Sequence, residues 1–250
     1  MAATLSQTVR SAPDGGRVAL TLPPGIAPLT WHAYTRLGGP SFLRAFDFAQ
    51  AGQHRVIPKK IFPGGRAETF RRQGFDLVVY EAADRSDSCL VWAGPYNEAT
   101  TWFGGPLPRR GYLNRVLSSV VFADAPEGAT LGAASALRGL QQFGTFVYAA
   151  GEEVMLTVKD ARTAREQVPS WQGAGQGEAE VWKEKLALDP EQADALSGTP
   201  YEWRYIVATS TAIVEMTFPR NPATLALARD AGGHRRVDAV VAGIRATWTV

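Results

Sequence analysis

The chain has 250 residues, of which 45% are hydrophobic and 20% are charged, and its formal net charge is +2. These proportions are typical of folded globular proteins and exclude an intrinsically disordered chain, in which apolar residues are few and net charge is high. Its single cysteine, Cys89, excludes an internal disulfide bond. We therefore expect folding without disulfide or metal in a reducing compartment, the cytoplasm.

The sequence also lacks the patterns that direct a chain into or across a membrane. Its first residues have no basic start followed by an apolar core of about 7 to 15 residues, so we expect no secretory signal. No apolar run reaches the roughly 18 residues needed to span a bilayer, so we expect no membrane insertion. Arginine outnumbers lysine by 21 to 5, which favours a bacterial source.

The first part of the chain predicts one strand and then irregular structure. Apolar and polar residues alternate over residues 17–22, which predicts a strand that Pro23 ends. Prolines and glycines interrupt residues 26–74, so we expect long loops there, with a helical or extended piece over residues 42–49.

A hairpin, a helix and a strand are predicted next. Residues 75–81 and 88–93 are rich in β-branched and aromatic side chains and flank a turn-forming segment, which predicts a hairpin. Apolar residues then recur at helical spacing over residues 112–119, and residues 120–122 are typical of a strand. The first half thus closes with a helix followed by a strand.

The second half opens with an expected helix and a loop. Residues 131–142 are rich in alanine and leucine, which predicts a helix, and strands are expected around residues 145–149 and 154–159. Glycine-rich residues 168–179 are expected to form a flexible loop.

The second half also closes with a hairpin, a helix and a strand. Asp189 and Pro190 predict the start of a short helix. Residues 202–208 and 211–218 predict a hairpin, and a helix is expected to begin at Asn221 and Pro222. Apolar spacing over residues 237–244 continues helically into a strand over residues 247–250.

Residues 75–122 and 201–248 therefore share one order of predicted elements. We expect an α+β fold of two similar halves, residues 1–125 and 126–250, each an antiparallel sheet with flanking helices. The shared order suggests an internal duplication. The alternative is that a hairpin followed by a helix is simply a common α+β unit.

A closing helix that leads directly into a strand occurs at residues 113–122 and again at residues 237–248. This pattern resembles the C-terminal element of the PsbP-like α+β sandwich family and covers about a third of the chain. The resemblance implies antiparallel sheets flanked by helices and a role as an adaptor, chaperone or assembly factor. No binding residues are carried over from the family, because no signature motif matches.

No motif of the sequence predicts catalysis, a metal or a cofactor. The three histidines lack zinc-ligand spacing, and the nucleophile motif Gly-x-Ser-x-Gly is absent. Cys89 lies in an apolar strand, where a buried, inert thiol is expected. His32, beside Trp31, is a structural residue, a general base or a stacked contact to a ligand. An enzyme of unknown class with its site between the halves near His32 therefore remains an alternative.

The strongest surface feature is a basic segment, residues 54–72. It contains six basic residues against one acidic residue, and two phenylalanines lie among them. The six candidate binding residues are Arg55, Lys59, Lys60, Arg66, Arg71 and Arg72. Such a segment is suited to binding an acidic protein surface or, alternatively, nucleic acid.

We favour a protein partner, because the net charge of +2 is far below that of most nucleic-acid-binding domains. The first half carries a net charge of +5 and the second half −3, which favours contact of the basic segment with acidic surface such as residues 152–194. We therefore predict a non-catalytic protein-binding or assembly protein that binds another protein or forms a homo-oligomer. Nucleic-acid binding through residues 54–72 is the further alternative.

Overall fold

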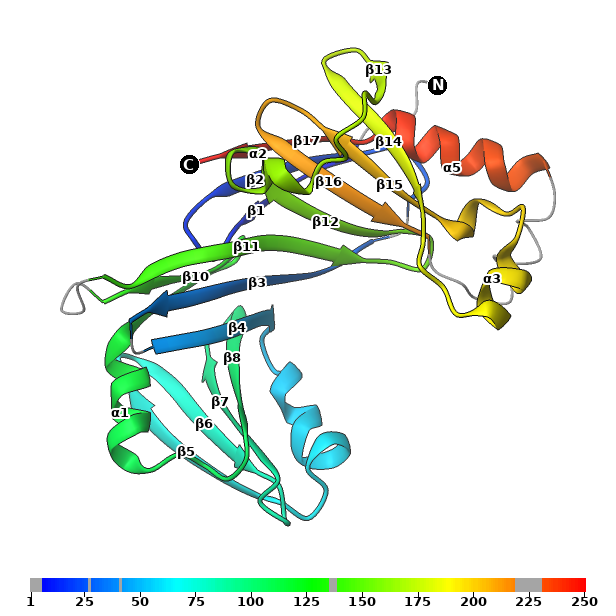
Figure 1. Ribbon diagram of the computed structural model, residues 1–250. Helices are drawn as coiled ribbons and strands as arrows, with labels where there is room; N and C mark the ends of the chain where they lie inside the picture. The colour runs from blue at the N-terminus through cyan, green and yellow to red at the C-terminus, as the bar shows by residue number, and fades with distance from the viewer. Residues whose placement is uncertain (1–5, 27, 41, 135–138, 219–230) are drawn as a thin grey trace. The chain divides into compact units, whose positions relative to one another are not determined.

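The computed structural model describes residues 6–26, 28–40, 42–134, 139–218 and 231–250 (Figure 1). Their most extensive element is an antiparallel sheet of 12 strands in the order β13-β14-β15-β16-β12-β11-β3-β4-β8-β7-β6-β5. The fold is therefore rich in β-structure, and the expected α+β class is wrong. Within the described residues, no helix is long and apolar enough to cross a membrane.

The long loops expected over residues 26–74 from their glycines and prolines are also wrong. Residues 26–74 contain three strands, and their glycines and prolines lie mainly at strand ends and turns. These strands are β3 (Thr30–Gly39), β4 (Phe42–Gln50) and β5 (Arg66–Arg72). Two short helical segments, η1 (Gln53–Val56) and η2 (Ile57–Ile61), connect β4 to β5.

The helix expected over residues 131–142 is also wrong. Residues 131–133 belong to β10 (Gly128–Ala133) and residues 141–142 to β11 (Gln141–Ala150), whereas residues 135–138 lie outside the described residues. β10 pairs with β9 (Val120–Ala125), and this pairing places Leu131 opposite Phe122 in the core. Pairing and burial thus override the helix propensity of the local sequence.

The predicted hairpins and several other predicted elements are confirmed. β6 (Phe75–Glu81) and β7 (Asp87–Ala93) form the first hairpin, and β15 (Trp203–Ala208) and β16 (Ala212–Thr217) form the second. The other confirmed elements are β2 (Arg17–Leu22), α1 (Arg110–Ser119), β12 (Met155–Asp160), α3 (Pro190–Leu196), α5 (Ala231–Gly243) and β17 (Arg245–Thr249). The helix start predicted at Asn221 and Pro222 lies outside the described residues.

The structure divides into two compact units, each assembled from several segments. Unit 1 comprises Met1–Arg10, Arg17–Trp31 and Val147–Val250, and unit 2 comprises Ser11–Gly16 and His32–Phe146. The elements not yet given are β1 (Ser6–Ser11), β8 (Asn97–Gly104), α2 (Ala161–Ala164), η3 (Arg165–Gln167), β13 (Ala174–Gln176), β14 (Ala179–Lys185) and η4 (Pro200–Glu202).

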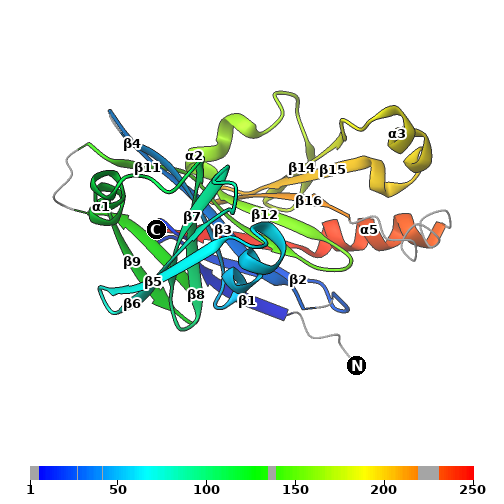
Figure 2. The ribbon, with the colours of Figure 1, turned by 90° about the horizontal axis from the view of Figure 1, so that it is seen from below.

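The two halves of the large sheet repeat one strand order. Outward from β3 the order is β3-β4-β8-β7-β6-β5, and outward from β11 it is β11-β12-β16-β15-β14-β13. Each set is followed in the chain by a helix that runs into a strand, α1 into β9 and α5 into β17 (Figure 2). β9 pairs with β10, and β17 pairs with β2. The internal duplication, with halves at residues 1–125 and 126–250, stays a prediction.

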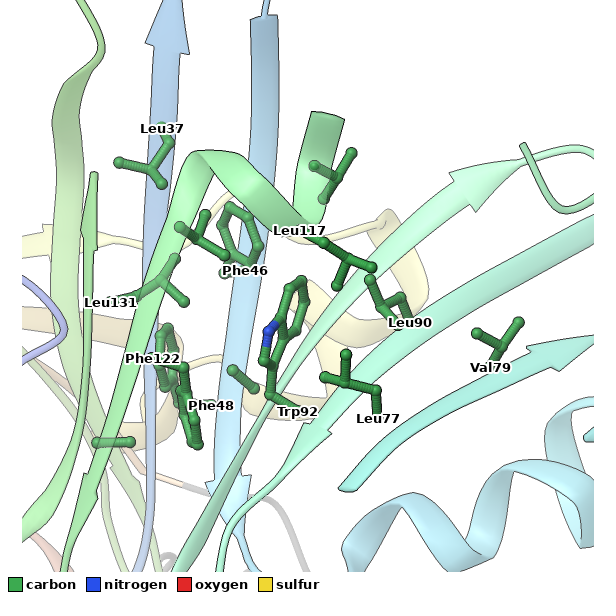
Figure 3. Close-up of a cluster of buried hydrophobic side chains, with 14 of the residues drawn as sticks. Leu37, Phe46, Phe48, Leu77, Val79, Leu90, Trp92, Leu117, Phe122 and Leu131 are labelled. Atoms are coloured by element: carbon green, nitrogen blue, oxygen red, sulfur yellow. The ribbon is translucent and has the colours of Figure 1, made fainter. Parts of the chain in front are cut away.

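The main core of unit 2 lies between its sheet and the cover formed by α1, β9 and β10 (Figure 3). Phe46 and Trp92 meet edge to face at its centre, with 5.8 Å between their ring centroids. A smaller cluster, in which Ile57 and Phe62 pack against Tyr80, Cys89 and other strand residues, includes the segment that connects β4 to β5. Alternation along the strands places these two clusters on opposite faces of the sheet.

Candidate functional site

A pocket of about 1000 Å³ opens on the sheet of unit 1. Its walls come from α2 and η3, the segment of residues 168–172, the turn between β13 and β14, and the turn between β15 and β16. Trp182 and Ile213, both buried, also line it. A concave site of this size is large enough for a small molecule or for side chains of a partner protein.

The pocket lies where the connection between β12 and β13 packs against the sheet. Asp160 ends β12 and caps α2, its carboxylate accepting a hydrogen bond from the Arg162 backbone N–H at 2.9 Å. α2 packs through Ala164, whereas the corresponding connection in unit 2 packs through the larger Ile57 and Phe62. The smaller side chain fills less of the space over the sheet.

Two tryptophans give the pocket its shape. The indole N–H of Trp182 donates to the carbonyl oxygen of Trp171 at 2.7 Å, which ties residues 169–173 to the sheet. Gly173 allows this approach, because a Cβ at that position would lie 2.7 Å from the Trp182 ring. The side chain of Trp171 itself is 55% exposed and lines the pocket. The glycine-rich segment expected to be a flexible loop therefore includes β13 and a wall of the pocket.

The charged groups of the pocket differ in their partners. Arg162 is held by Asp160, with 2.6 Å between Nη2 and Oδ2, and this hydrogen bond lowers the pKa of Asp160 although burial opposes the shift. Glu178 and Glu180 also line the pocket, and neither forms an ion pair with any described residue. Arg165 also lines the pocket, so the lining holds two guanidinium groups and two carboxylates. Because Asp160 pairs with Arg162, the exposed Trp171 indole and the two unpaired carboxylates are the groups of the lining that suit an organic cation.

The basic segment is spread over several elements of unit 2. Arg55 lies in η1, Lys59 and Lys60 lie in η2, and Arg66, Arg71 and Arg72 lie in β5. Alternation along β5 directs Arg71 to one face of the sheet and the other two arginines to the opposite face. The structure therefore does not gather all six on one face. Partner binding through them stays a prediction.

His32 lies on β3, and Asp47 lies on the neighbouring β4. Burial lowers the pKa of His32, although a backbone hydrogen bond with Phe48 and the charge of Asp47 oppose this. Burial raises the pKa of Asp47, against a hydrogen bond from Trp102 and the charge of His32. The charge of each group thus affects the pKa of the other. An enzymatic role for His32 stays a prediction.

A second histidine–carboxylate contact joins His54 and Glu98, and no sequence motif predicted it. Nδ1 of His54 lies 2.6 Å from Oε2 of Glu98, and the two side chains are 12% and 3% exposed. Glu98 also accepts hydrogen bonds from the backbone N–H groups of Gly52 and His54. The pair fixes the start of η1 against β8, and the sequence separation of 44 positions explains why no local motif predicts it.

Cys89 is expected to be unreactive in the folded protein. Its side chain is fully buried, and burial raises the pKa of the thiol from 9.0 to about 12. Such a shift leaves about a thousandfold less thiolate at pH 8, and the thiolate is the reactive form. Ellman's reagent at pH 8 should therefore label the native chain at least about a hundredfold more slowly than the chain in denaturant. Equal rates would contradict the described burial.

Among the described residues, no group of three or more His, Cys, Asp or Glu side chains could hold a metal ion. Comparison of the chain with protein-family models, curated proteins and solved structures found no match. The resemblance to the PsbP-like family therefore stays a prediction.

Proposed function

We propose that this chain is a non-catalytic protein-binding protein that holds an arginine side chain of its partner in the pocket of unit 1. The observation that carries the proposal is the exposed Trp171 indole in a pocket that also contains the unpaired carboxylates of Glu178 and Glu180. A reduced, buried Cys89 suits the cytoplasmic location that forms part of this proposal.

Arginine fits this pocket better than other side chains. Its planar guanidinium stacks on an indole ring and donates paired hydrogen bonds to a carboxylate, whereas a lysine ammonium does neither as well. Tryptophan and arginine are also the residues that most often dominate the energy of protein interfaces. The free Glu178 and Glu180 supply the charge, and Trp171 supplies the ring.

Calorimetric titration with the blocked peptide acetyl-Ala-Ala-Arg-Ala-Ala-amide tests the proposal. We expect saturable binding with a Kd of about 1 mM or tighter, since one stacked and hydrogen-bonded guanidinium is worth a few kcal/mol. Trp171→Ala should weaken binding about 10-fold through the lost stacking. Glu178→Gln/Glu180→Gln should weaken it about 10-fold or more through the lost charge.

Matched controls separate the pocket from general effects. Trp171 bonds Trp182 only through its backbone carbonyl, so Trp171→Ala leaves that contact in place. Trp102→Ala removes an exposed tryptophan of unit 2 and should leave the peptide affinity unchanged. The same peptide with citrulline in place of arginine keeps the shape without the charge and should not bind. Equal binding of both peptides, or none by either, would overturn the proposal.

A further inference from the structure

β5 is an outer edge of the large sheet and is unusually open for an edge strand. It has seven residues, whereas β13 at the other end of the strand order has three. All residues of β5 except the half-buried Arg72 are exposed. The strand lies beside β6 at the edge of its sheet (Figure 1). Proteins usually keep edge strands short or cover them, because a row of free backbone groups is a template for another strand.

The hairpin turn fixes which backbone groups of β5 are free. Gln73 and Gly74 form a two-residue turn with φ values of 54° and 86°, as tight hairpins require. Arg72 and Phe75 close this turn, so their backbone groups bond each other. The backbone N–H and C=O groups of successive residues point to opposite sides of a strand. The groups of Phe70 and Glu68 therefore also bond to β6, whereas those of Thr69 and Arg71 point away from β6 and are free to pair with another strand.

We propose that β5 pairs antiparallel with β5 of a second copy of this chain, in a register centred on Phe70. In this register Phe70 lies opposite the partner's Phe70. Glu68 lies opposite the partner's Arg72, and by the twofold symmetry Arg72 lies opposite the partner's Glu68. Thr69 and the partner's Arg71 exchange backbone hydrogen bonds, as do Arg71 and the partner's Thr69.

The side chains of this register complement one another on one face. Phe70, 37% exposed, Glu68 and Arg72 have the same parity along β5 and therefore project from one face of the sheet. They occupy non-hydrogen-bonded pairs, in which facing side chains come closest. An aromatic pair flanked by two opposite-charge pairs is a favourable cross-strand combination.

The neighbouring registers are disfavoured by charge. A register centred on Thr69 creates two arginine pairs, because Arg66 lies opposite the partner's Arg72 and Arg72 lies opposite the partner's Arg66. A register centred on Glu68 places Glu68 opposite the partner's Glu68, so two carboxylates face each other. In the register centred on Phe70, Arg66 lies beyond the paired residues, so its hydrogen bond to Glu81 at 2.6 Å is kept. A register centred on Ala67 also pairs opposite charges, Arg66 with the partner's Glu68, but it pairs only three residues of β5. The register centred on Phe70 therefore combines complementary charges with the longer pairing. This inference concerns unit 2 and does not rest on the proposed function of the pocket.

Sedimentation equilibrium of the intact chain at low salt tests the pairing by charge reversal. We expect a reversible monomer–dimer equilibrium with a dimer Kd below about 200 µM, as suits a small interface. Glu68→Arg and Arg72→Glu should each raise the dimer Kd at least about 10-fold, because each reversal creates two like-charge pairs. The double variant Glu68→Arg/Arg72→Glu should restore the Kd to within about threefold, because both pairs are complementary again.

Two further variants keep the result decisive. Thr69→Pro removes an outward N–H that β6 does not use, so it should abolish the dimer while leaving the circular dichroism spectrum unchanged. Arg109→Glu makes the same charge change at the start of α1 and should leave the dimer Kd unchanged. A wild-type chain that stays monomeric at 200 µM, or a double variant without recovery, would overturn the proposal. Binding of a mixed single-stranded oligonucleotide by such a monomer would favour nucleic acid as the partner of β5.

Discussion

Replacing Phe46 with alanine is expected to lower the free energy of unfolding of unit 2 by about 3 to 5 kcal/mol. The Phe46 side chain is fully buried and packs edge to face on Trp92. Its removal forfeits the burial of the ring and leaves a cavity that surrounding strands cannot close, because each is fixed by backbone pairing.

Urea unfolding followed by circular dichroism and tryptophan fluorescence measures this change. Leu43→Ala lies on the same strand and is the matched control, because Leu43 is 65% exposed. The control should change the free energy of unfolding by less than about 0.5 kcal/mol. Similar losses in the two variants would show that Phe46 is not at the centre of a packed core.

Replacing Glu81 with glutamine is expected to cost about 2 to 3 kcal/mol at pH 7. The Glu81 side chain is 1% exposed. Its carboxylate accepts hydrogen bonds from Arg66, from Arg85 at 3.2 Å and from the backbone N–H of Leu107 at 3.1 Å. The group thus ties β5, the β6–β7 turn and the segment before α1 to one buried charge. A neutral amide leaves two guanidinium groups without their anion.

The contribution of Glu81 to the free energy of unfolding should depend on pH. Burial opposes ionisation, but the hydrogen bonds from Leu107, Arg66 and Arg85 outweigh it and lower the pKa of Glu81 below its ordinary value of 4.5. A lowered pKa in the folded state stabilises the protein fully above the unfolded pKa, and this stabilisation is lost as pH falls through the folded pKa.

Urea unfolding of wild type and Glu81→Gln at several pH values tests this account. The two proteins should differ most at pH 7 and converge in acid below pH 4.5. Glu127→Gln, at an exposed position, is the control and should match wild type throughout. A difference that is independent of pH would show that the charge of Glu81 does not stabilise the fold.

Hairpins and closing helices were predictable because their signals are local. β-branched and aromatic residues around a turn identify β6 with β7, and β15 with β16. The order of the large sheet was not predictable, because it depends on pairs such as β4 with β8, which are far apart in the chain. Residues 131–142 failed for a different reason, because β10 forms a local hairpin with β9 whose pairing outweighs the helix propensity of alanine and leucine.

The pocket was missed for a related reason. Its lining residues come from several segments between residues 161 and 213, and no local motif unites them. One feature of the sequence did point to the pocket, because Trp171 is a large aromatic residue within a glycine-rich segment. That composition was interpreted as flexibility, whereas Gly173 serves close packing against Trp182. The six basic residues were predictable because they lie within one short segment, residues 54–72, but closeness in sequence does not determine which face of β5 each side chain occupies.

The most direct test of the proposed function is a nuclear magnetic resonance titration of the isotope-labelled intact chain with the arginine peptide. The account predicts saturable shifts of the Trp171 indole N–H signal and of backbone amides in α2, η3, the β13–β14 turn and the β15–β16 turn. The citrulline peptide should leave these signals in place. Shifts confined to unit 2, or saturable binding that leaves the Trp171 indole signal unmoved, would contradict the assignment of the pocket as the binding site.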